Sequence, residues 1–84
     1  MNNLINKIYN YINEENLNVD IKIINIENYN DELYYADYIY IENGINSDIH
    51  KGGIYVEDGI GYLCSTFDNA EYEPFMKAMI KIEI

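Results

Sequence analysis

The sequence has no arginine and no tryptophan, and it contains only one cysteine, one proline and one histidine. A single cysteine excludes an internal disulfide, which fits a reducing cytoplasm. Cys64 falls in an expected strand with no catalytic constellation around it, so we interpret it as a small buried hydrophobe. No apolar run has spanning length and no leader pattern is visible, so we expect a soluble protein of the cytoplasm.

Cations are scarce. Five lysines face fifteen acids, which gives a formal net charge of -10. A protein that binds DNA, RNA or an anionic membrane needs cations to displace counterions, so these partners are disfavoured. The charge points to a basic partner or to imitation of something acidic, although charge also simply keeps small proteins soluble.

The residue patterns of catalytic and metal sites are missing. No glycine-rich loop opens a helix, no His and Cys cluster has metal spacing, and the many carboxylates come without a nucleophile or base. His50 stands alone in a loop expected over residues 43–53, and we interpret it as a solvated side chain. We therefore expect no enzymatic activity, no cofactor and no metal.

The hydrophobic content of 49% predicts one folded domain over residues 1–84. Near the start, Asn2 or Asn3 can cap a helix. An apolar stripe follows at three- and four-residue intervals, formed by Leu4, Ile5, Ile8 and Ile12. Asn16 tolerates the left-handed conformation and is expected to end this helix.

The middle of the chain indicates strands. Val19, Ile21 and Ile23 alternate with polar residues, and the apolar side then shifts to Ile24 and Ile26. A bulge or burial of both faces explains that shift.

A polar stretch follows, in which Asn30 or Asp31 would cap a short second helix through Leu33 to Tyr35. Another strand is expected over residues 38–42. It has Ile39 and Ile41 on one side, and Tyr38 and Tyr40 on the other.

Asp58-Gly59 between two apolar runs is a strong hairpin signal. As a two-residue turn it pairs Glu57 with Ile60 and sets the register of the two strands on either side of it. One face then carries Ile54, Val56, Leu63 and Phe67, and the other carries Tyr55 and Tyr62 together with Tyr38 and Tyr40. Gly61, opposite Val56, leaves room for a neighbouring element.

The stretch from Tyr62 to Ile84 is compatible with two structures. Asp68 and Glu71 have capping-box spacing, which favours a helix. Pro74 would disrupt that helix, and Ile80, Ile82 and Ile84 alternate with charged residues, which favours a strand, an acidic loop and a second strand. We adopt the second interpretation, so the predicted fold is α+β. An N-terminal helix and a short second helix pack on an antiparallel sheet of about five strands.

The acids concentrate at Glu27, Asp31 and Glu32 and again at Asp68, Glu71 and Glu73. Spaced carboxylates on a rigid edge can stand in for the phosphates of DNA. Such a protein would occupy the cationic groove of a DNA-binding enzyme, with electrostatically steered association.

One segment carries a resemblance to a known family. Residues 66–75, read with the opening Met1-Asn2-Asn3-Leu4, resemble the phage uracil-DNA glycosylase inhibitors, which are small acidic DNA mimics. The family's Thr-Ser-Asp-Ala-Pro-Glu-Tyr-Lys-Pro-Trp stretch is matched at Thr66, Asp68, Glu71, Tyr72 and Pro74, with Phe75 in place of Trp. The close match covers about a fifth of the chain.

The resemblance implies a monomer that forms a one-to-one complex with uracil-DNA glycosylase. In the family, an acidic edge strand with a Gln-Glu-Ser signature enters the enzyme's DNA groove. Here Glu27 and Asn28 are the best counterparts of that signature, and Asp31 and Glu32 resemble the acids after it. Tyr72 and Phe75 would anchor the acidic bend to the core.

The resemblance also implies an apolar pocket that captures the enzyme's intercalating Leu. The candidates for this pocket are Ile24, Ile26, Leu33, Ile39, Ile41 and Leu63, each of which also fits ordinary core packing. Two other functions stay open: an anti-CRISPR or other anti-defence inhibitor of a different nucleic-acid enzyme, and a plain structural or assembly domain.

Overall fold

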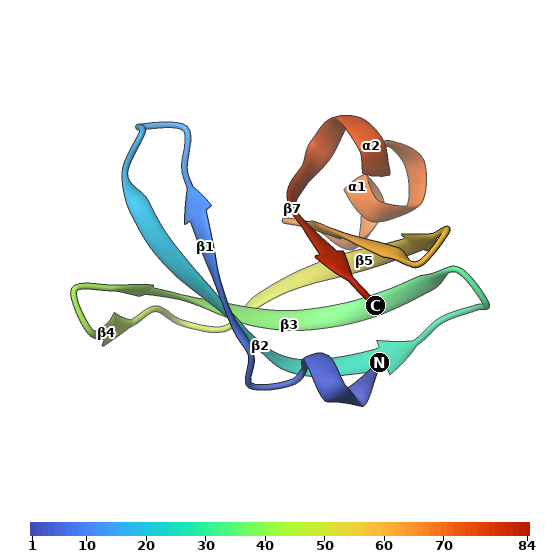
Figure 1. Cartoon of the computed structure of the whole chain (residues 1–84), viewed down its shortest axis with the longest axis horizontal. Coiled ribbons are helices and arrows are strands. Elements are labelled where there is room, and N and C mark those ends of the chain that lie inside the picture. Colours follow the sequence, from blue (N-terminus) through green and yellow to red (C-terminus); the bar gives the residue numbers. More distant parts are fainter.

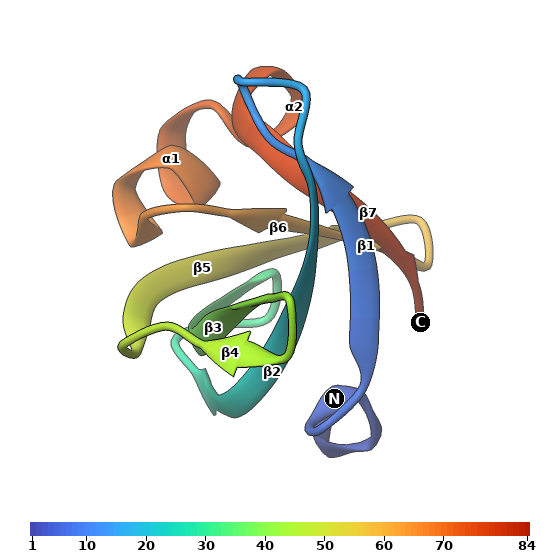
Figure 2. The same cartoon turned by 90° about the vertical axis from the view of Figure 1, so that its left-hand side faces the viewer.

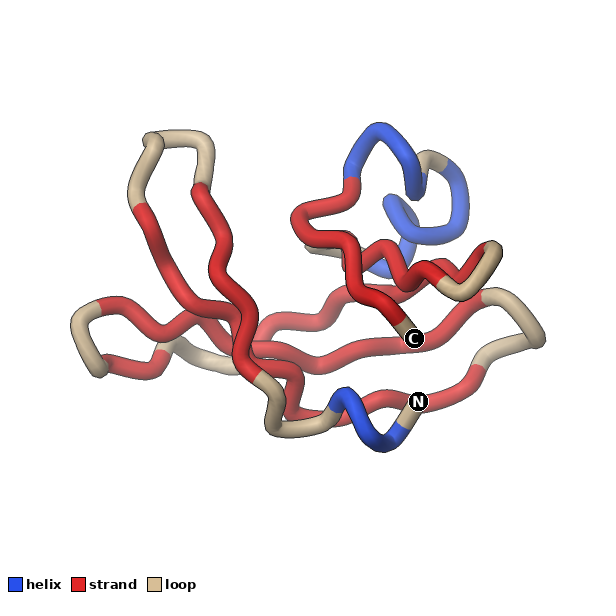
Figure 3. Tube along the Cα trace, viewed as in Figure 1, coloured by secondary structure: helices blue, strands red, loops and turns tan.

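Antiparallel strands dominate the computed structural model, which describes residues 1–84. Strands take 56% of the residues and helices 15%, so the predicted α+β fold is wrong. A single sheet curls into a nearly closed barrel in place of a helix-covered sheet (Figures 1 and 2). Helical turns occur only near the N-terminus and just before the last strand (Figure 3).

The chain runs through the sheet mostly as a meander. A 3-10 turn, η1 (Asn2–Leu4), precedes the strands, and two short helices, α1 (Phe67–Tyr72) and α2 (Pro74–Lys77), lie between the last two strands. The sheet order is β1-β2-β3-β5-β6-β7, all neighbours are antiparallel, and β4 pairs with β3. The strands are β1 (Ile8–Ile12), β2 (Asn18–Asn28), β3 (Leu33–Glu42), β4 (Ile45–Asn46), β5 (His50–Glu57), β6 (Ile60–Cys64) and β7 (Ala78–Glu83).

Residues in the left-handed conformation set the tight turns. Asp58 and Gly59 have φ angles of 52° and 76°, as the two-residue turn with matching twist requires. The predicted β5–β6 hairpin is confirmed in register, with Glu57 opposite Ile60. Asn43 and Gly44 form a similar turn between β3 and β4, with φ angles of 52° and 76°.

The expected N-terminal helix is wrong beyond its first turn. Ile8 and Ile12 are four residues apart, a spacing that suits a helix but is also even, so it fits a strand equally well. In β1 both isoleucines are exposed while Tyr9 and Tyr11 pack against the core. Asn16 is left-handed as predicted, with φ 61°, but it turns a β-hairpin.

Two further expectations in the middle of the chain are corrected. No second helix forms at Leu33. The Asn30 Oδ1 accepts hydrogen bonds from the Glu32 and Leu33 amides, as a helix cap would, but the Leu33 carbonyl oxygen accepts from the Tyr29 and Asn30 amides, which closes a turn, and β3 begins at Leu33. The loop expected over residues 43–53 contains β4 and the start of β5. Of the two explanations for the shift of the apolar side in β2, the structure supports the bulge, since the register shifts between Ile23 and Asn25.

The barrel interior is filled from every strand except the short β4. Tyr38, which is 1% exposed, lies opposite Ile23 and points inward with Tyr40, so these tyrosines do not share a face with Tyr55 and Tyr62 as predicted. Phe67 does not lie on the predicted face either. It is the first residue of α1, and it packs against a second, smaller core cluster. The buried members of the main core are Leu4, Ile21, Ile23, Ala36, Tyr38, Ile54, Leu63 and Ile82.

Close backbone packing beside Tyr38 depends on Gly52. A Cβ atom at Gly52 would lie 2.5 Å from the Cys64 carbonyl oxygen and 2.7 Å from the Tyr38 ring. The Tyr38 hydroxyl donates a hydrogen bond to the Ser65 carbonyl oxygen at 3.2 Å. Gly61 also leaves space where a side chain would lie, and the Ile84 side chain occupies it. Such space opposite Val56 was predicted.

The final stretch is strand, helices, strand. Thr66 caps α1 with its Oγ1, which accepts a hydrogen bond from the Asn69 amide at 3.1 Å. Pro74 begins α2 at the first position of the helix, where a missing donor costs nothing. The alternation that predicted a strand is confirmed in β7, where Ile82 is buried. The acidic segment that we expected to be a loop is helical instead.

Replacing Gly52 with alanine should lower the free energy of unfolding by about 1–3 kcal/mol, since the new methyl group overpacks a rigid backbone site. Urea unfolding followed by circular dichroism measures this change. Asn46→Ala, on the exposed β4, is the control and should stay within about 0.5 kcal/mol of the wild type. Equal stability of G52A and wild type would contradict the packing described for Tyr38.

Candidate functional site

The two acidic stretches of the sequence meet on one face of the protein. Tyr35 on β3 lies opposite Glu27 on β2, and its ring stacks on Phe67 of α1 at a centroid distance of 4.2 Å. Tyr29, in the β2–β3 turn, contacts both rings edge-on, at 5.6 Å from Tyr35 and 5.1 Å from Phe67. We call Tyr29, Tyr35 and Phe67 the aromatic triad.

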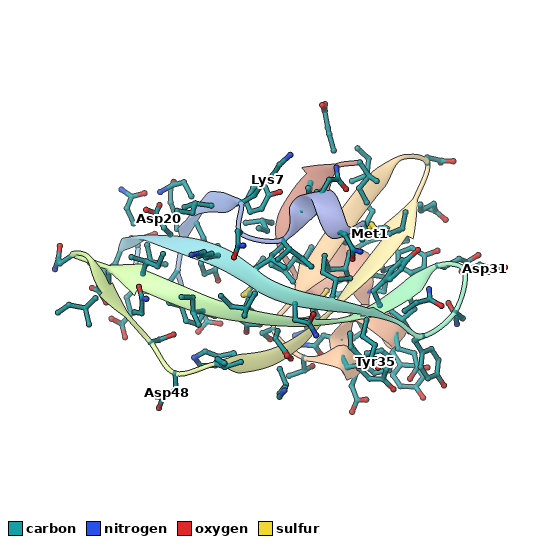
Figure 4. All side chains as sticks on the ribbon, turned by 90° about the horizontal axis from the view of Figure 1, so that it is seen from below. Met1, Lys7, Asp20, Asp31, Tyr35 and Asp48 are labelled. Carbon is teal, nitrogen blue, oxygen red and sulfur yellow. The ribbon has the colours of Figure 1, made fainter.

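Acidic residues from both stretches lie next to members of the triad. Glu27 is the cross-strand neighbour of Tyr35, and Asp68 follows Phe67 directly. Figure 4 shows Asp31 and Tyr35 toward the same end of the molecule, with Asp20 and Asp48 toward the other. We call Glu27, Asp31, Glu32, Asp68 and Glu71 the acidic face.

The carboxylates of the acidic face have no cationic partner in the fold. The only ion pair of the protein joins the Lys51 Nζ and the Asp37 Oδ1 at 3.1 Å, and neither residue belongs to the face. Unpaired carboxylates on one surface make the local electrostatic potential more negative, which favours a cationic ligand.

Tyr72 reports this potential. Interaction with the Glu71 carboxylate, and to a smaller extent the nearby charge of Asp68, raises the pKa of Tyr72 above its usual value. The Tyr72 ring is 75% exposed, so it does not anchor the segment to the core as expected. Phe75 is 57% exposed and contacts Tyr55 and Tyr62 edge-on, outside the barrel.

Glu27 lies on an open strand edge. β1 pairs with β2 only along residues 18–22, so β2 from Asn25 to Asn28 pairs with β3 alone. Asn28 alternates away from Glu27 along the strand, and its side-chain amide donates to the Asn30 carbonyl oxygen at 2.6 Å. Asn28 therefore shapes the turn and is separated from the acidic face.

The six expected pocket residues do not gather into a cavity. Leu63 lies in the main core, and Leu33 lies in the smaller cluster with Cys64 and Ala70. Ile39 and Ile41 lie opposite Lys22 and Asp20, on the face of β3 away from Tyr38. Ile24 is at the bulge and Ile26 packs against the core rim, and neither cavity of the protein is lined by any of the six.

The aromatic triad was missed from the sequence. Each acidic stretch contains or adjoins an aromatic residue, since Tyr29 lies between Glu27 and Asp31 and Phe67 precedes Asp68. That shared pattern is the only sequence signal for the triad. The contact between stretches about forty positions apart comes from the sheet topology.

Cys64 is fully buried, and burial raises the pKa of its thiol to about 11. No group of three or more His, Cys, Asp or Glu side chains is arranged to hold a metal ion. None of the helices combines the length and hydrophobicity needed to cross a bilayer.

The Cys64 thiol should react with Ellman's reagent at pH 8 about a hundredfold more slowly than an unperturbed thiol, because so little thiolate forms at that pH. The absorbance of the released dye measures the rate. Unfolding in urea should restore rapid labelling, whereas rapid labelling of the folded protein would contradict the burial of Cys64.

No family model, no curated protein and no solved structure matches the chain.

Proposed function

We propose that the protein is a stoichiometric inhibitor of uracil-DNA glycosylase that places its acidic face in the enzyme's cationic DNA groove. The observation that carries the proposal is the convergence of two distant acidic stretches on one face without a neutralising cation. The inhibitor acts as a monomer in a one-to-one complex and does not itself bind nucleic acid.

Binding by this face follows from its charge and its rigidity. The unpaired carboxylates steer the protein to a cationic groove and form pairs with Lys and Arg side chains that otherwise hold phosphates. Tyr29 and Tyr35 add exposed aromatic surface, on which an Arg guanidinium stacks favourably. Because the triad and the β2–β3 turn are held by packing and hydrogen bonds, little conformational entropy is lost on binding.

The segment that resembles the glycosylase inhibitors supplies part of this face. Thr66 caps α1, Asp68 and Glu71 present carboxylates, and Pro74 begins the next helix. The expected N-terminal helix is absent beyond one 3-10 turn, and the pocket candidates are dispersed. Capture of an intercalating Leu is therefore left out of the proposal, which uses the acidic face alone.

An inhibitor of another nucleic-acid enzyme, such as an anti-CRISPR or other anti-defence protein, is the second candidate. The observation that favours it is the barrel fold, which lacks the predicted helix packed on a sheet and leaves an acidic face suited to any cationic DNA groove. The same face would then bind a different enzyme.

Uracil release from uracil-containing DNA by a bacterial glycosylase should fall to background at one equivalent of the protein. Loss of inhibition in high salt is expected, because the interaction is largely electrostatic. Undiminished uracil release at stoichiometric excess and low salt would eliminate the glycosylase as target. Inhibition of a CRISPR nuclease under the same conditions would then support the second candidate.

The Glu27→Lys substitution should lower the association rate with the glycosylase about tenfold, because it reverses a charge on the open edge that enters the groove. Surface plasmon resonance measures the rate. Asp48→Lys makes the same change in net charge far from the face and should change the rate much less. Equal effects of the two variants would show that total charge, rather than the acidic face, governs association.

A further inference from the structure

The barrel stays open along the seam between β1 and β7, and a groove of about 750 Å³ lies there. One wall is the β1–β2 hairpin and the other is formed by α2 and the start of β7. Tyr11, Val19 and Tyr40 contribute an apolar and aromatic lining. The groove is separate from the aromatic triad, since no residue of the triad or the acidic face lines it.

The hairpin wall is held rigidly. The Asn13 Oδ1 accepts hydrogen bonds from the amides of Glu15 at 2.9 Å and Leu17 at 3.0 Å, and Asn16 takes the left-handed turn position. On the lining, the rings of Tyr11 and Tyr40 are stacked at 6.5 Å. The Tyr40 hydroxyl donates to the Met79 Sδ of the opposite wall at 3.4 Å. The groove is therefore already formed in the free protein.

One edge of β1 offers unused backbone groups to this seam. The Asn13 amide bonds to the Leu17 carbonyl oxygen, and hydrogen-bonded pairs in an antiparallel ladder recur at every second residue. Tyr11 and Tyr9 therefore bond toward β2, and the backbone groups of Ile8, Asn10 and Ile12 point to the open side. An unpaired edge of this kind accepts an added strand.

The charges on the rim select the strand that fits. Glu14, Glu15 and Glu42 line the groove with a single cation, Lys77. A second copy of the chain is a poor occupant, because its net charge of -10 is repelled and its own β1 carries no cation. A segment with lysine or arginine side chains complements the rim, and apolar side chains between them suit the lining.

We propose that this groove binds an extended segment of a partner protein, in which cationic and apolar side chains alternate, by strand addition to β1. The exposed Met76, at 81%, and the flexible Met79 adapt the second wall to different apolar side chains. This site goes beyond the proposed inhibition, because it requires neither the acidic face nor a DNA-binding enzyme.

A nine-residue peptide of alternating Lys and Val, titrated into ¹⁵N-labelled protein at low salt, tests the proposal. Chemical-shift changes are expected at Tyr11, Tyr40 and Met79, and slower amide exchange at Ile8, Asn10 and Ile12. A peptide with Glu in place of Lys should not bind. The Lys peptide with N-methyl groups at every second residue should bind at least about tenfold more weakly, because it cannot pair along an edge.

Matched variants separate the groove from the net charge. Glu14→Lys combined with Glu15→Lys should weaken binding by about tenfold or more, whereas Asp48→Lys combined with Glu83→Lys should change it by less than about threefold. The proposal is overturned by equal losses in the two double variants or by shifts centred on Tyr29 and Tyr35. The proposal is also overturned if the chemical shifts of the groove residues do not change at millimolar peptide. Self-association of the protein that slows exchange of the same β1 amides without peptide would overturn it as well.

Discussion

The close approach of β3, β5 and β6 around the Tyr38 ring is the constraint on which the rest of the structure depends. It is possible because Gly52 has no side chain between that ring and the Cys64 carbonyl oxygen. Gly53 similarly lets α1 approach, since a Cβ there would lie 2.8 Å from the Ala70 Cβ. With α1 seated in this way, Phe67 reaches Tyr35, and the two acidic stretches become one face.

Turn residues in the sequence predicted the hairpin between β5 and β6 correctly, but no local pattern predicted how distant strands pack together. Asp58-Gly59 fixed the β5–β6 register, because few residues other than Asp, Asn and Gly tolerate two successive positive φ angles. β1 was mistaken for a helix because the four-residue spacing of Ile8 and Ile12 satisfies both periods, whereas the residues that pack against the core are Tyr9 and Tyr11. The inward placement of Tyr38 required knowledge of Gly52 across the sheet, which no single-strand pattern contains.

The acids of the candidate site were identified from their clustering in the sequence. That the two acidic stretches meet on one face of the protein was not predicted. Charge is visible in a sequence, whereas the contact between Tyr35 and Phe67 depends on a chain that crosses the sheet several times. The fold leaves fourteen of the fifteen acids without an ion-pair partner. Self-repulsion of this kind lowers stability, and a cationic partner relieves it on binding.

Hydrogen–deuterium exchange of the protein, free and mixed with uracil-DNA glycosylase, would locate the surface that contacts the enzyme. We expect slower exchange on complex formation over residues 25–35 and 66–72, which hold the acidic face and the triad, with little change over β4 and the β3–β4 turn. Protection confined to other parts of the surface, or no protection at saturating enzyme, would contradict this expectation.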